Sequence, residues 1–173
     1  MKPIEILQGK WLGHPLHPAI VHVPIGLWIV AFLLDLINRN HATAGTTEHL
    51  AVYCVIGGLL GALAAVPTGA ADWAPIKKEK PAWKLGLYHM SLNLLAAIVW
   101  AANLGLRWKA LPTADPVTPA ILLTSAAGTA LILLSGYIGS RMVFAHGVSV
   151  ARHSKDKLRR RAERAGARVP AKD

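Results

Sequence analysis

The chain has 173 residues, which is enough for one domain. It is 53% hydrophobic and still carries a formal net charge of +10, a combination that argues against a soluble domain and is typical of membrane proteins, whose charges flank the bilayer. The single cysteine, Cys54, excludes an intramolecular disulfide and any cysteine-clustered zinc or iron–sulfur site.

Residues 1–18 are expected to form a cytoplasmic segment, and the first apolar span follows it directly. The sequence GHPLHPAIVHVPIGLW of residues 13–28 joins the two and places three histidines among three prolines. Proline is tolerated in the first turn of a helix, where its missing N–H costs nothing, but it kinks a helix interior. The prolines are therefore expected to set where the span begins and where it bends.

Four stretches are long and apolar enough to cross a bilayer: about 19–38, 49–70, 84–106 and 119–142. The connections between them are too short to hold a soluble domain. Soluble helices show a polar face, which these spans lack, so the predicted fold is all-α, an integral membrane four-helix bundle. The remaining residues, 143–173, form a basic tail that is expected to contact anionic lipid headgroups rather than nucleic acid.

The positive charges predict how the bundle is oriented. With four spans, both termini and the second connection lie on one side, which carries sixteen of the Lys and Arg residues. The other side carries three, namely Arg39, Arg107 and Lys109. Cytoplasmic loops carry the excess of Lys and Arg, so both termini are expected in the cytoplasm and the protein in the bacterial inner membrane.

Small residues are frequent in the second and fourth spans. Gly57 and Gly61 recur at a spacing of four, as do Gly58 and Ala62. Such residues let helices approach closely in lipid, and they could also make room for a flat cofactor. Both interpretations stay open at the level of the sequence.

Five of the eight histidines are predicted to gather at the cytoplasmic end of the bundle. They are His14, His17, His22, His89 and His146. An ionisable residue inside a span is expensive and marks a functional site by default, which applies to His22 and His89. The other three could also be ordinary interfacial side chains. Asp72 and Trp73, where the second span ends, belong to the same end of the bundle.

The histidines suit a haem of the b type. Such a haem requires two neutral imidazoles on facing helices at similar depth. His22 and His89 are predicted as this pair, because the first and third spans lie diagonally across an up–down bundle. Asp72 is expected to accept a ring N–H from a ligating histidine, and Asn93 shares the helix face of His89. The other histidines could bind haem propionates, bind a second metal or relay protons.

Two alternatives stay open beside haem. Three or four histidines with Asp72 would suit a non-haem zinc, copper or iron site. In the other alternative the protein is an accessory or assembly subunit without a cofactor. The sequence contains no Walker loop, GxSxG elbow, Rossmann fingerprint or HExxH motif, so an electron-transfer or accessory role is expected rather than a stand-alone enzyme.

GHPLHPAIVHVPIGLW, with PTGAADW, YHMSLNL and FAHGVSV further along, resembles a bacterial membrane family known as domain of unknown function 2231. The resemblance covers about residues 11–151. It implies a four-span protein whose relatives carry the same clustered histidines, sometimes beside Rieske-type redox domains, and this company favours electron transfer. The family's histidine positions correspond to His14, His17, His22, His89 and His146, and its acidic–tryptophan pair to Asp72–Trp73. The long basic tail departs from the family, and a redox partner is expected to be a separate protein.

Overall fold

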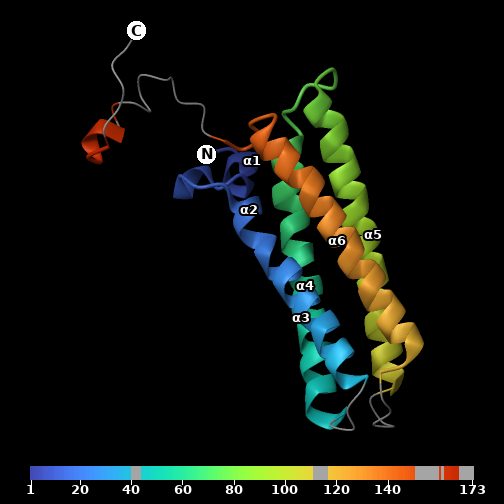
Figure 1. Ribbon diagram of the computed structural model, residues 1–173. Helices are drawn as coiled ribbons and strands as arrows, with labels where there is room; N and C mark the ends of the chain where they lie inside the picture. The colour runs from blue at the N-terminus through green and yellow to red at the C-terminus, as the bar shows by residue number, and fades with distance from the viewer. Residues whose placement is uncertain (40–43, 111–116, 151–159, 161, 168–173) are drawn as a thin grey trace.

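The protein is a bundle of long helices, shown in the computed structural model of Figure 1. The structure describes residues 1–39, 44–110, 117–150, 160 and 162–167, and no strand occurs among them. The helices are α1 (Pro3–Leu7), a 3-10 turn η1 (Lys10–Leu12), α2 (Leu16–Ile20), α3 (His22–Asn38), α4 (Ala44–Trp73), α5 (Pro81–Ala110) and α6 (Pro119–Phe144). Most of the basic tail, including residues 151–159 and 168–173, lies outside the described residues, so its predicted contact with lipid is not addressed by the structure.

Four helices are long and apolar enough to cross a membrane. They are Leu16–Asn38, Glu48–Trp73, Pro81–Ala110 and Pro119–Phe144. Large apolar side chains cover their outer faces, among them Leu63, Leu94 and Leu123, each more than half exposed. In water such a surface would be a strong aggregation liability, whereas in lipid it is the expected outer face. The predicted all-α membrane bundle is confirmed.

The bundle consists of two helical hairpins. The first span, which consists of α2 and α3, packs along α4, and α5 packs along α6. The hairpins join through contacts of α3 with α6 and of α4 with α5, which places α3 and α5 diagonally across the core. The N-terminus, the α4–α5 connection and the end of α6 lie at the same end of the bundle (Figure 1). For brevity we call this the N-terminal end.

Proline causes the break between α2 and α3. Pro24 has no N–H to donate to the carbonyl of Ile20, and its ring crowds that carbonyl, so regular helix is interrupted one residue later, at Val21. The chain re-forms helical bonding with the amide of Ile25, which donates to the Val21 carbonyl at 3.3 Å. The span therefore enters the bundle as a short first segment that carries His17.

A pair of tryptophans fills the centre of the core. Trp28 of α3 and Trp100 of α5 stack with their ring centroids 5.5 Å apart and their planes 12° apart. Each ring edge lies against a glycine of the neighbouring helix, Trp28 against Gly58 and Trp100 against Gly128. The small residues of α4 and α6 thus serve tight packing, as small residues do in membrane helices.

Substitution of Gly58 tests this packing. A Cβ at Gly58 would lie 2.2 Å from Nε1 of Trp28, a side chain too buried and stacked to move away. We expect Gly58→Ala to lower the free energy of unfolding by about 1–3 kcal/mol, the usual cost of overpacking. Gly136→Ala is the control, because a Cβ there meets nothing within 4 Å. Thermal unfolding in detergent checks the prediction, and equal melting temperatures for the two variants would contradict it.

A buried charged cluster lies at the opposite end of the bundle. Arg107 of α5 pairs with Asp35 of α3 at 2.5 Å, and both side chains are fully buried. Asn103 accepts from Nε of Arg107 at 2.7 Å, and the Ser125 hydroxyl donates to Asp35 at 2.6 Å. The interpretation of Arg107 as a loop charge is wrong: α5 extends to Ala110 and keeps this guanidinium inside the bundle. Arg39 and Lys109 then remain as the basic side chains of this end among the described residues.

Candidate functional site

Inward-facing residues recur along the helices at alternating spacings of three and four. In α3 the buried positions are Pro24, Trp28, Ala31, Asp35 and Asn38. This is the heptad pattern of helices that pack with a left-handed twist. Seven residues before Pro24 the same stripe reaches His17, and in α5 the equivalent stripe contains His89.

His17 is fixed by α4. Its Nδ1 lies 3.1 Å from the carbonyl oxygen of Ala65 and 3.3 Å from the hydroxyl of Thr68. A carbonyl oxygen can only accept, so Nδ1 carries the proton and donates it. The Thr68 hydroxyl donates to the same carbonyl at 2.8 Å. The other ring nitrogen, Nε2, therefore keeps its lone pair.

His89 is fixed by α6 in the same manner. Its Nδ1 lies 2.9 Å from the carbonyl oxygen of Ser135 and 2.8 Å from the hydroxyl of that residue. Nδ1 is again the donor. The Asn93 amide lies 3.1 Å from Nε2 and 2.9 Å from the His89 carbonyl, to which it donates. Nε2 of His89 is thus the acceptor nitrogen of the ring, and the Asn93 amide contacts it.

The imidazole rings of His17 and His89, here called the facing pair, lie next to each other inside the bundle in a T-shaped arrangement. Their centroids are 6.2 Å apart and their planes are 87° apart. Two imidazoles bound through nitrogen on opposite sides of a metal, at about 2.0 Å each, have ring centres about 6 Å apart. The observed centroid separation of 6.2 Å is close to this value. In a tetrahedral site the ring centres would be closer, at about 5 Å.

Glycine makes room for both rings. A Cβ at Gly69 of α4 would lie 2.7 Å from Cε1 of His17, and a Cβ at Gly139 of α6 would lie 3.0 Å from Cε1 of His89. The two histidines are thus seated on glycines in the same way as the two tryptophans below them. Larger residues at these positions would displace the imidazoles from the core.

The two hairpins repeat the same residues at the same spacing. Eleven residues separate His17 from Trp28, His89 from Trp100, Gly58 from Gly69 and Gly128 from Gly139. Because α3 and α5 run in the same direction (Figure 1) and the spacings repeat, the two halves are related by an approximate twofold axis along the bundle. Across this axis His17 meets His89 and Trp28 meets Trp100, so each half contributes one imidazole to the site.

His22 and His14 lie elsewhere. His22, which was predicted to be a ligand together with His89, is exposed, and its Nδ1 contacts the carbonyl oxygen of Ala19 in the preceding helix α2 at 3.3 Å. Five residues turn a helix by about 140°, so His17 and His22 cannot share a face. His14 is exposed and contacts the Pro15 carbonyl oxygen at 3.0 Å. The ring that faces His89 belongs to His17.

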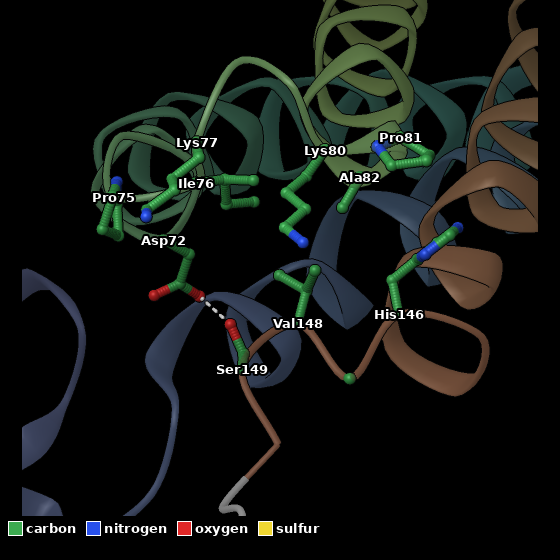
Figure 2. Close-up of a pocket in the computed structure, with 11 residues that line it drawn as sticks. Asp72, Pro75, Ile76, Lys77, Lys80, Pro81, Ala82, His146, Val148 and Ser149 are labelled. Carbon is green, nitrogen blue, oxygen red and sulfur yellow. Dashed lines mark hydrogen bonds between the residues drawn. The ribbon is translucent and has the colours of Figure 1, made fainter.

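The remaining predicted residues lie where the spans end. His146 and Asp72 line a cavity between the α4–α5 connection and the segment after α6 (Figure 2). Asp72 accepts a hydrogen bond from the Ser149 hydroxyl at 2.8 Å. The imidazole N–H groups of His17 and His89 donate to backbone carbonyls and not to Asp72. Trp73 packs on Trp83 with centroids 5.1 Å apart and donates to its carbonyl at 3.0 Å.

The described part of the chain does not bring the predicted histidines together into one metal site. Within the described part of the chain, no group of three or more His, Cys, Asp and Glu residues could hold a metal ion. The histidine cluster expected from topology is thus divided into a facing pair, a cavity residue and two exposed rings. This geometry does not supply the ligand set of a non-haem zinc, copper or iron centre.

A comparison with known families matches residues 13–152 to a family described as a predicted membrane protein, DUF2231. The chain belongs to this family. The matched region contains all four spanning helices and both facing histidines of this DUF2231 protein. Comparisons with curated proteins and with solved structures found no match.

Sequence reasoning did not identify the partners that hold the imidazoles of this DUF2231 member. Every residue has a backbone carbonyl, so the sequence cannot single out those of Ala65 and Ser135 as hydrogen-bond acceptors. The heptad stripe that leads from Trp28 back to His17 is a readable signal, as is the eleven-residue spacing shared by both halves. Either one selects His17 over His22.

Proposed function

We propose that this protein is a small b-type cytochrome-like electron-transfer protein in which His17 and His89 hold the haem iron. One observation carries the proposal: the imidazoles lie 6.2 Å apart, and each is held through Nδ1 so that Nε2 is its acceptor nitrogen. Haem would supply one-electron exchange between its ferric and ferrous states. Its donor and acceptor would be other redox proteins of a membrane complex.

The hydrogen bonds of both histidines support this assignment. Metal-bound histidines commonly donate their second ring N–H to a carbonyl or carboxylate, which fixes the tautomer and raises the basicity of the ligating nitrogen. Ala65 and Ser135 provide such carbonyls on two different helices. Binding at Nε2 of His89 would displace one contact of the Asn93 amide, which keeps its bond to the His89 carbonyl.

The location of the charges supports a bacterial inner membrane protein with cytoplasmic termini. With Arg107 buried, the far end of the bundle keeps Arg39 and Lys109, and sixteen Lys and Arg residues belong to the N-terminal end and the tail. This bias follows the positive-inside rule. The facing histidines would then lie in the cytoplasmic half of the membrane, within reach of a cytoplasmic or membrane-bound electron donor.

Absorption spectra of the full-length protein, purified in mild detergent, test the proposal. We expect a Soret band in the oxidised protein, and sharp α and β bands after reduction with dithionite. Elemental analysis of the same sample should find iron. If protein purified from cells supplied with haem precursor lacks both the bands and iron, the proposal is overturned. A different metal in the sample would indicate a two-coordinate non-haem site.

The relative orientation of the rings gives a second prediction. Because separate backbone carbonyls hold the two imidazoles, the 87° between their planes should persist in the oxidised haem protein. Perpendicular axial imidazoles produce a strongly anisotropic low-spin ferric signal with one very large g value. Electron paramagnetic resonance of the oxidised protein checks this, and an ordinary rhombic spectrum of parallel rings would contradict the geometry.

A further inference from the structure

A cavity of about 450 Å³ opens at the N-terminal end of the bundle, away from the paired histidines. Its walls are the α4–α5 connection, the beginning of α5 and the segment 146–149 that follows α6 (Figure 2). These are the points at which three of the four spans end. The cavity therefore lies at the level where lipid headgroups meet the protein.

The charges that line the cavity are mainly positive. Lys77 and Lys80 belong to the α4–α5 connection and His146 to the opposite wall, and the Lys80 side chain reaches toward Val148 across the opening (Figure 2). Among the described residues neither lysine forms an ion pair. The N-terminus of the 30-residue helix α5 adds its partial positive charge at Pro81.

The one carboxylate among the lining residues, that of Asp72, is hydrogen-bonded to another lining residue. Asp72 accepts a hydrogen bond from Ser149, whose backbone has a φ of 58°. A left-handed conformation is unfavourable for serine, so the segment adopts it because the surrounding contacts require it. The Val148 amide fixes the same turn by donating to the Met142 carbonyl at 3.0 Å. Lys77, Lys80 and His146 thus line the cavity beside this fixed turn.

We propose that this cavity binds a phosphate-bearing anion, and that its source is the headgroup of an anionic phospholipid. Basic pockets between membrane helices bind such headgroups. The packed pair of Trp73 and Trp83, whose rings are tilted by 31°, borders the same level, and tryptophans are typical of the membrane–water interface. The assignment is independent of haem, because no residue of the facing pair lines the cavity.

Lipid binding to the full-length protein tests the proposal. The delipidated protein is titrated with phosphatidylglycerol in phosphatidylcholine nanodiscs. Native mass spectrometry counts the bound lipid molecules, and the melting temperature of the protein is measured on the same samples. The pocket variant is Lys77→Gln/Lys80→Gln. The control is Lys78→Gln/Lys84→Gln, which removes the same charge from exposed lysines outside the lining and keeps the basic tail. We expect about tenfold weaker binding in the pocket variant and wild-type binding in the control.

Two results would overturn the proposal: equal losses in both variants, which would reflect general attraction to a basic surface, or no loss in either. A separate arm adds inorganic phosphate to protein in pure phosphatidylcholine. Phosphate could raise the melting temperature of the wild type and not that of the pocket variant, while phosphatidylglycerol does not bind selectively. That result would support the phosphate site and overturn the lipid as its source. Protection by phosphatidylglycerol alone supports the site and its source together.

Discussion

Arg107→Ala is expected to be among the most destabilising single substitutions in the bundle, with a loss of about 3–5 kcal/mol of unfolding free energy. The reason is the charge it leaves behind. Asp35 is fully buried and pairs with Arg107, so removal of the guanidinium strands a carboxylate in the core. Ser125 would remain as a hydrogen-bond donor to Asp35, and a hydroxyl does not replace a full charge.

A double variant separates the lost pair from a general packing defect. Asp35→Leu/Arg107→Met replaces both charges with apolar side chains, and buried ion pairs replaced in this way often cost little. We expect the double variant to be more stable than Arg107→Ala. Lys109→Ala is the matched control, since Lys109 is exposed on the same helix and should change stability by less than about 0.5 kcal/mol. Thermal unfolding in detergent measures all three, and equal melting temperatures for Arg107→Ala and Lys109→Ala would contradict the buried pair.

His17→Ala and His89→Ala should each abolish the six-coordinate haem spectrum. Either variant leaves a single imidazole ligand, and a haem that has lost one of its two protein ligands is readily lost during purification. His22→Ala is the matched control, because His22 is exposed and does not face the pair. The haem-to-protein ratio and the reduced spectrum measure the effect. Retention of the spectrum in both single variants, or its loss in His22→Ala, would contradict the assignment of ligands.

A ligating substitution distinguishes coordination from a structural role. Methionine can replace histidine as an axial ligand and raises the reduction potential. We expect His17→Met to retain haem with a higher midpoint potential than the wild type. A merely structural histidine at this position would leave the potential unchanged when replaced by methionine.

The fold could be predicted because its main cause is visible in the sequence. Four long apolar stretches determine the number of spans, and an even number places both termini at one end of the bundle. An up–down bundle also predicts the diagonal placement of the first and third spans, across which Trp28 stacks on Trp100.

The candidate site could be predicted only in part. His89 lies half-buried in the core, and a histidine inside a span marks a candidate site. Its predicted partner, His22, is exposed, whereas His17 lies beside His89. Hydropathy places His22 deeper in the span than His17, but helical phase decides which ring is turned toward the core. The break at Val21 and the heptad stripe decide between them, and both depend on how α3 packs.

The charged cluster could not be found from the sequence for a different reason. Arg107 lies near the end of its span, where hydropathy treats it as a loop residue. Its burial depends on Asp35 seventy-two positions away, and a pairing over such a separation is visible only once the hairpins are assembled. The same holds for the cavity at Lys77 and His146, which three separate segments build.

We expect one iron to lie between the two halves of the bundle. Anomalous diffraction at the iron absorption edge, from crystals of the haem-loaded protein, would locate it. We expect a single strong peak midway between Nε2 of His17 and Nε2 of His89. A peak at His22 or His146, or an iron site that leaves the two facing imidazoles unbound, would contradict it.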